Sequence, residues 1–165
     1  MLANSIKTCL LVFLLLIVSA CASNPEPSNR ELSASQKSTA NDVLFHAISL
    51  VGTPYKYGGN SPNTGFDCSG LINYVFLTSA GLKLPRTTLE LIEINARQIN
   101  QDRLYPGDLV YFNSNGGKVS HIGIYVGERR FVHAPSSGGT VRMDNIDTPY
   151  WQKHFVTAKR VLAAN

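Results

Sequence analysis

The stretch Tyr105-Pro106-Gly107-Asp108-Leu109-Val110-Tyr111-Phe112 marks the point at which the character of the chain changes. Its Pro-Gly pair predicts a turn, and the apolar residues that follow favour a strand. Further short segments rich in β-branched and aromatic residues come after it, separated by turns that contain Gly or Asn. The predicted strands are Leu109–Phe112, Val119–Val126, Phe131–Ala134, Thr140–Met143 and Phe155–Leu162. We expect them to form a meandering, mostly antiparallel sheet.

The segments before this turn have the spacing of helices instead. Apolar residues recur at helical intervals from Asn41 until Gly52 interrupts them. A second helix is predicted over Cys68–Ala80, because Asp67 is a good N-cap and Gly81 can end the helix.

A third helix is predicted from Thr87 to about Arg97, because Thr87 and Glu90 have the spacing of a capping box. Helices followed by strands indicate the α+β class, with the N-terminal helices packed on one face of the sheet. The 165 residues have room for one such domain and a tail. A hydrophobic content of 44% with 16% charged residues is that of a globular protein.

The first twenty residues have the parts of a secretory signal. Lys7 precedes an apolar run from Cys9 to Val18, and the small residues Ser19 and Ala20 follow. The run is about half of the roughly 20 residues that span a bilayer as a helix, so a permanent transmembrane anchor is the weaker interpretation.

The exit of this segment, Val18-Ser19-Ala20-Cys21, resembles the bacterial lipoprotein box, in which the Cys is acylated and becomes the first mature residue. Ordinary cleavage after Ala20 is the alternative. The resemblance implies a lipid anchor on Cys21. In Gram-negative relatives, an Ala after the Cys implies the outer membrane, with the domain facing the periplasm.

Three regions are therefore expected: a lipoprotein signal peptide over 1–20, a lipidated Cys and flexible tether over 21–40, and a folded domain over 41–165. The tether lacks apolar periodicity. The formal net charge of +4 is too small to suggest a nucleic-acid partner, and no basic stripe with interleaved aromatics is present. A monomer without a cofactor is expected.

Cys68 is the thiol that remains in the folded domain once Cys9 leaves with the signal and Cys21 carries lipid. It starts the second predicted helix, where backbone N–H groups and the helix dipole favour a thiolate. We expect the pKa of Cys68 to be lowered. Gly70 allows another backbone to approach the helix closely.

The predicted strands supply a base for this thiol. Alternation puts His121 and Gly123 on one face, so that Gly123 leaves space for substrate or for the Cys68 helix. His133 lies in the next strand, and a short turn over 127–130 makes the two imidazoles cross-strand neighbours. We interpret Cys68, His121 and His133 as nucleophile, base and orienting group. A metal site built from the same three residues is the rival interpretation.

Several short motifs, in order, resemble the NlpC-type cell-wall cysteine peptidases over residues 41–163. They are Gly52-Thr53-Pro54-Tyr55-Lys56-Tyr57-Gly58-Gly59, Phe66-Asp67-Cys68-Ser69-Gly70-Leu71, Leu84-Pro85-Arg86-Thr87-Thr88, Pro106-Gly107-Asp108-Leu109-Val110, His121-Ile122-Gly123-Ile124-Tyr125-Val126-Gly127 and Phe131-Val132-His133-Ala134. The resemblance is greatest to the outer-membrane murein endopeptidase lipoproteins of Gram-negative bacteria.

This resemblance implies a small papain-like domain in which Cys68 is the nucleophile, His121 the base and His133 the third polar residue. It adds Tyr55, with a hydroxyl near the thiolate that helps to bind the oxyanion or a substrate amide. The implied reaction is hydrolysis of stem-peptide amide bonds in peptidoglycan, at D-alanine–diaminopimelate cross-links or, alternatively, at γ-D-glutamyl-diaminopimelate bonds. A thiol acyltransferase and an inactive wall-binding lipoprotein on the same fold are further alternatives. Lys56 and Arg86 lie beside the motifs as solvated charges or as contacts to substrate carboxylates.

Overall fold

The structure is a computed structural model that describes residues 32–114, 116–137 and 139–162. The signal segment and Cys21 lie outside these residues. The helices are α2 (Ala34–Ser49), α3 (Cys68–Ala80), α4 (Thr88–Ile92) and α5 (Pro149–His154), with a 3₁₀ turn over Gln101–Arg103. Among the described residues, no helix combines the length and the apolar character needed to cross a bilayer.

One antiparallel sheet of six strands forms the centre of the domain. Its order is β3-β8-β4-β5-β6-β7, so β4 to β7 form a meander and β8 returns beside β4. The strands are β3 (Arg97–Ile99), β4 (Leu109–Phe112), β5 (His121–Gly127), β6 (Arg130–His133), β7 (Arg142–Asn145) and β8 (Phe155–Arg160). A separate two-stranded ribbon pairs β1 (Asn60–Ser61) with β2 (Gly65–Phe66).

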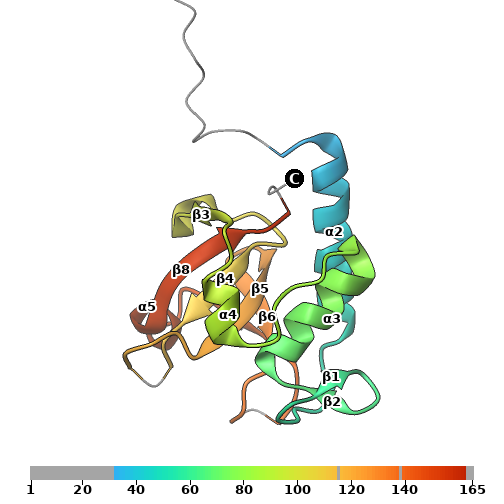
Figure 1. The fold of residues 1–165 in the computed structure, drawn as a ribbon. Helices are drawn as coiled ribbons and strands as arrows, with labels where there is room; N and C mark the ends of the chain where they lie inside the picture. Colours follow the sequence, from blue (N-terminus) through green and yellow to red (C-terminus); the bar gives the residue numbers. More distant parts are fainter. Residues whose placement is uncertain (1–31, 115, 138, 163–165) are drawn as a thin grey trace, which may run out of the picture. The chain divides into compact units, whose positions relative to one another are not determined.

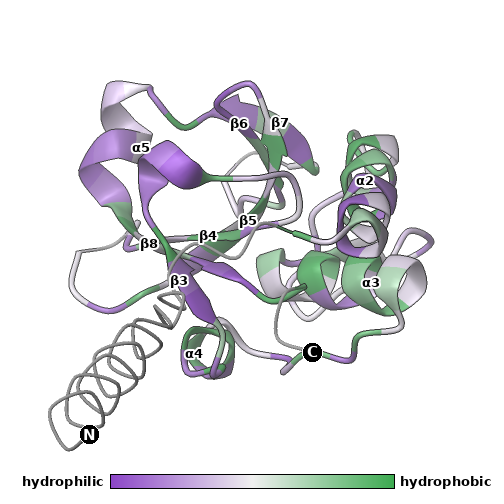
Figure 2. Cartoon of the chain, turned by 90° about the horizontal axis from the view of Figure 1, so that it is seen from above, coloured by the Kyte–Doolittle hydropathy of each residue, from purple (hydrophilic) through white to green (hydrophobic). Residues whose placement is uncertain are grey.

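The sheet has a hydrophobic cluster on each face. Ile122 and Ile124 of β5 belong to the cluster that includes apolar residues of α2, α3 and α4. Tyr125 and Phe131 belong to the second cluster, which Trp151 of α5 completes. Figures 1 and 2 show α2 and α3 on one side of the sheet and α5 on the other. The N-terminal helices therefore cover one face, as expected for the α+β class.

The helix that carries Cys68 has the predicted bounds. Asp67 is its N-cap, and Gly81 ends it with a left-handed φ of 63°. The strand over 109–112 is also confirmed, and the other strands lie within a few residues of their predicted positions. Between β5 and β6, Glu128 and Arg129 have φ values of 50° and 59°, which gives the short turn that was expected.

The prediction for the third helix was too long. α4 ends at Ile92, and the carbonyl groups of Ile92 and Ile94 accept hydrogen bonds from Lys159 of β8. Arg97 then starts β3, an edge strand paired with β8. Tertiary pairing thus replaces the helical continuation that the local sequence favours.

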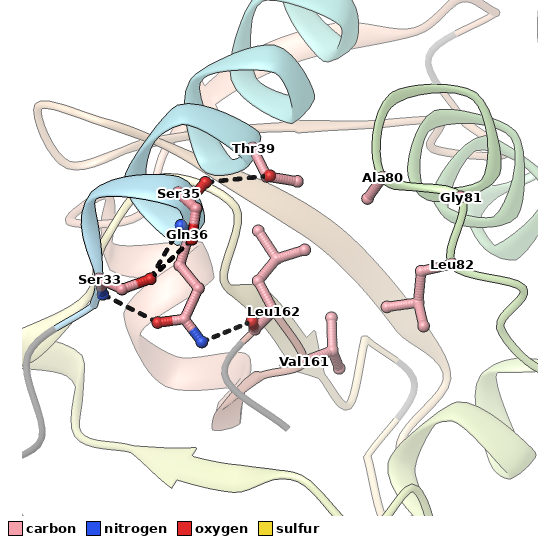
Figure 3. Close-up of a pocket in the computed structure, with 9 residues that line it drawn as sticks. All are labelled: Ser33, Ser35, Gln36, Thr39, Ala80, Gly81, Leu82, Val161 and Leu162. Atoms are coloured by element: carbon pink, nitrogen blue, oxygen red, sulfur yellow. Dashed lines mark hydrogen bonds between the residues drawn. The ribbon is translucent and has the colours of Figure 1, made fainter. Parts of the chain in front are cut away.

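The prediction for the first helix was too short. α2 begins at Ala34, and a capping box between Ser33 and Gln36 explains this start. The Gln36 side chain also donates to the carbonyl of Leu162 over 3.3 Å, as Figure 3 shows. The predicted tether over 21–40 is therefore ordered from Leu32 onward, and residues 21–31 lie outside the described part of the chain.

Candidate active site

Cys68 is the first residue of α3, at the end of the helix where backbone N–H groups lack helical partners. The Asp67 carboxylate accepts from the N–H of Gly70 at 2.7 Å and from the N–H of Gly58 at 2.9 Å. It thereby fixes the helix start against the 58–59 loop. The backbone N–H groups of Cys68 and Ser69 point toward the sulfur, where they lower the pKa of the thiol.

Arg86 holds this helix start in place. Its guanidinium binds both oxygens of Asp67 at 2.9 and 2.8 Å and donates to Ser69 Oγ at 2.8 Å. Burial raises the pKa of Asp67, but the hydrogen bonds from Arg86, Gly70 and Gly58 together with the charge of Arg86 lower it by more, so the net pKa is lowered. Asp67 is therefore a carboxylate, and Arg86 is a paired charge that is 41% exposed and lines the cleft of Cys68.

Gly70 allows the close backbone approach that its sequence context predicts. A Cβ at this position would lie 2.0 Å from the carbonyl oxygen of Gly59. The loop that carries Tyr57 and Gly58 can consequently lie directly against the first turn of α3.

His121 and His133 are joined side chain to side chain. His121 Nε2 lies 2.8 Å from His133 Nδ1, and His133 Nε2 lies 3.1 Å from an oxygen of Asp144. A carboxylate only accepts, so His133 donates through Nε2 and accepts through Nδ1. His121 must then donate through Nε2, which leaves its Nδ1 unprotonated. Since both ring nitrogens of His133 are engaged, the donor set does not favour the rival metal site.

Asp144 is the residue of this chain that the sequence did not reveal. Its Oδ2 accepts from His133, from the Trp151 indole at 3.0 Å, and from Arg142 at 3.0 and 3.2 Å. These donors, with His133 first, hold the pKa of Asp144 well below its usual range. The carboxylate charge is therefore permanent at the pH of any plausible assay.

Trp151 supports both imidazoles from α5. Its ring stacks on His121 with centroids 5.8 Å apart and meets His133 edge-on at 5.1 Å. The helix that carries it was not predicted. Thr148 caps this helix and Pro149 occupies its first turn, a Thr-Pro signal that was available in the sequence.

Cys68 and His121 line one cleft of about 580 Å³, together with Tyr55, Tyr57 and Thr88. Cys68 Sγ lies 3.6 Å from Thr88 Oγ1. Burial raises the pKa of Tyr55, and a negative charge on Cys68 would raise it further. The cleft thus contains three of the four residues singled out for chemistry, and the fourth, His133, is hydrogen-bonded to His121. His46 and His154 lie outside this cleft and bond to Ser79 and Asn113.

Two expectations about the site were wrong. Gly123 does not leave space for substrate or for the Cys68 helix, because a Cβ there would lie 2.6 Å from the Phe131 ring. α3 packs on the opposite face, against Ile122 and Ile124. Gly123 instead lets the side chains of β6, including His133, lie close to β5.

The second wrong expectation concerns the thiol. Burial raises the pKa of Cys68, and this outweighs the hydrogen bonds from Thr88 and from the helix N-terminus. Burial also lowers the pKa of His121 to about 3, with a further contribution from His133. The resting site therefore holds a neutral thiol and a neutral imidazole.

The fold and the Cys–His–His arrangement are those of a papain-like cysteine peptidase domain. The model of the NlpC/P60 family matches residues 52–160, and the chain belongs to this family. It is 38% identical over 159 residues to the probable endopeptidase NlpC of Escherichia coli, covering 94% of this chain and 99% of that protein.

Other relatives are longer than this chain. The murein DD-endopeptidase MepH of E. coli is 40% identical over 114 residues, which cover 68% of this chain and 42% of MepH. The chain thus matches less than half the length of MepH, and 55% of the probable endopeptidase YafL. An NLP/P60 family protein from Staphylococcus aureus, described as similar to lipoprotein, has a similar structure, with a TM-score of 0.68, 34% identity, and coverage of 82% of this chain and 44% of that one.

Proposed function

We propose that this protein hydrolyses amide bonds in the stem peptides of peptidoglycan through a thioester on Cys68. The observation that carries the proposal is the cleft shared by Cys68 and His121, with the free Nδ1 of His121 defined by His133 and Asp144. Two relatives of this chain, MepH and MepS of E. coli, are named murein DD-endopeptidases, and they support the substrate class. D-alanine–diaminopimelate cross-links are the proposed bonds.

The neutral resting pair defines the order of proton transfers. His121 Nδ1 takes the Cys68 proton as the sulfur attacks the substrate carbonyl carbon, so the imidazolium forms only as the C–S bond forms. In this proposal, backbone N–H groups at the start of α3 and the Tyr55 hydroxyl stabilise the oxyanion. His121 then gives its proton to the leaving amine as the C–N bond breaks. In the second half, water gives a proton to His121 as its oxygen attacks the thioester carbon. The C–S bond then breaks, and His121 returns the proton to the Cys68 sulfur.

Two alternatives use the same residues. Relatives of Bacillus subtilis named a DL-endopeptidase (CwlT) and a gamma-DL-glutamyl hydrolase favour the γ-D-glutamyl-diaminopimelate bond. A thiol acyltransferase would pass the same acyl group to an amine instead of to water. An inactive wall-binding lipoprotein would need no ordered histidine pair.

Mass analysis of muropeptide dimers incubated with the purified protein separates these functions. Monomers with a new D-alanine carboxyl group indicate the proposed peptidase, and cleavage at γ-D-glutamate indicates the alternative bond. Amide exchange indicates a transferase, and intact dimers indicate a binding protein. Cys68→Ala is expected to abolish cleavage while the domain stays folded, and Cys21→Ala, the matched control, is expected to leave cleavage unchanged.

We further propose that the chain is exported as a lipoprotein, anchored in the outer membrane through Cys21 and facing the periplasm, with the domain acting as a monomer. The lipoprotein box in the sequence supports this proposal, and so does the likeness to the S. aureus protein described as similar to lipoprotein. Globomycin is expected to leave an unprocessed precursor. Normal processing in its presence would exclude lipidation.

A further inference from the structure

A second cleft, of about 670 Å³, adjoins the one that holds Cys68. Ser120, His121 and Ser136 line both clefts, whereas Cys68 lines only the first and Arg142 only the second. His121 therefore stands at the boundary between two open spaces.

The chemistry of the proposed reaction assigns a part of the substrate to each space. The acyl group becomes bonded to Cys68 Sγ and must lie in the cleft onto which the sulfur opens. The leaving amine takes its proton from His121 and departs from the other side of the scissile bond. The leaving group consequently extends into the second cleft.

Arg142 gives the second cleft its charge. The side chain is 43% exposed, and its Nε and Nη2 both bind Asp144 Oδ2. Within the described residues, no partner is recorded for Nη1, so the edge of the guanidinium formed by Nη1 and Nη2 keeps unused donors on a side chain that lines the cleft. Asp144 is the sole acid among the lining residues, and its Oδ2 already accepts from His133, Trp151 and Arg142.

A guanidinium held on one edge by a partly buried carboxylate presents a second edge of fixed direction, which suits a planar, bidentate anion such as another carboxylate. We propose that Arg142 binds a carboxylate on the carbon that bears the leaving amine. This inference rests on the proposed function and selects between its two bonds.

In a cross-link from D-alanine to diaminopimelate, the released amine and a free carboxylate share one carbon atom. In the γ-D-glutamyl bond, the corresponding carboxyl group is an amide within the stem peptide. A carboxylate site next to His121 therefore favours cleavage of the cross-link, and it disfavours substrates in which this carboxyl group is amidated.

The test compares two synthetic muropeptide dimers that differ only at this carboxyl group, free acid in one and carboxamide in the other. The wild-type kcat/KM is expected to be about tenfold or more higher for the acid, the size expected of a charge-assisted bidentate contact. Arg142→Gln is expected to bring the ratio of the two kcat/KM values close to one. Since Arg142 also holds Asp144, both rates fall in this variant, but that effect cancels in the ratio.

Arg130→Gln is the matched control, because Arg130 is similarly exposed on the neighbouring strand and pairs with Glu128. Arg130→Gln is expected to keep the wild-type ratio. Arg142→Lys keeps the charge but lacks the two parallel N–H donors of a guanidinium, so it is expected to give an intermediate ratio. Equal wild-type rates for the two dimers, or an unchanged ratio in Arg142→Gln, would overturn the inference and leave the proposed function standing. If the wild type cleaves neither dimer, the proposed function fails and the inference with it.

Discussion

His133 donates its Nε2 hydrogen to Asp144 over 3.1 Å, and this contact sets the direction of every proton in the histidine pair. Because the carboxylate cannot donate, His133 has a single tautomer and His121 has its Nδ1 free. Asp144 thus acts on the reaction through His133, as a positioning residue, and it supplies a charge that compensates the imidazolium formed during attack.

Asp144→Asn is expected to lower kcat by roughly 10- to 100-fold, a fraction of what general acid–base catalysis contributes. The amide oxygen still accepts a hydrogen bond, but the negative charge that stabilises the imidazolium is lost. KM should rise as well, because Asp144 lines the second cleft and holds Arg142 there. Steady-state kinetics on a muropeptide dimer measures both constants.

Asp147→Asn is the control for this variant, since Asp147 makes a bidentate pair with Arg129 on the surface, away from both histidines. Its kcat should equal that of the wild type. A kcat for Asp144→Asn within twofold of wild type would show that the charge of Asp144 has no part in the reaction.

The pKa values of Cys68 and His121 predict how the free enzyme reacts with iodoacetamide. With the thiol pKa raised by burial and the pKa of His121 lowered to about 3, alkylation should increase steadily with pH, through and beyond the ordinary thiol value of about 8.5. A preformed thiolate–imidazolium pair would instead give a rapid plateau between about pH 5 and 7. The Cys68→Ala variant measures the background reaction, and a plateau between about pH 5 and 7 would contradict the neutral pair.

The sequence was sufficient to predict the helix of Cys68 and the two histidine strands, because their signals are local. Asp67 and Gly81 each fix one end of α3 through their own backbone and side-chain geometry. The alternation in β5 likewise placed His121 and Gly123 on one face.

What the sequence did not show depends on contacts between distant segments. Asp144 fell just beyond the predicted strand 140–143, and only the register of β7 against β6 brings its oxygen to His133. Trp151 reaches the histidines from a six-residue helix too short to give a periodic signal. Which face of the sheet α3 would cover was also not encoded locally, and for that reason the role of Gly123 was misjudged.

The packing at Gly123 predicts a loss of stability on substitution. In Gly123→Ala, the new Cβ would lie 2.6 Å from Phe131 and 3.0 Å from the carbonyl oxygen of Val132. Overpacking of this kind costs about 1–3 kcal/mol, and here it also displaces the strand of His133. Urea unfolding should therefore show a lower free energy of unfolding, and kcat should fall with it. Wild-type stability would mean that β6 can shift without cost.

Asp108 and Arg160 form another bidentate pair, and its burial predicts a large effect on stability. Arg160 binds the two oxygens of Asp108 at 2.7 and 2.8 Å. The side chain of Asp108 is 1% exposed and that of Arg160 is 11% exposed. Asp108→Asn leaves the guanidinium charge uncompensated in the interior. The free energy of unfolding should fall by about 3 kcal/mol or more, as is typical when one partner of a buried pair is removed.

Asp147→Asn again provides the comparison, because it makes the same change in a bidentate Asp–Arg pair whose side chains are exposed. Water and salt screen that pair, so its unfolding midpoint in urea should stay close to that of the wild type. Burial is the main difference between the two pairs. Equal unfolding midpoints for Asp108→Asn and Asp147→Asn would therefore show that burial does not control the stability contributed by the Asp108–Arg160 pair.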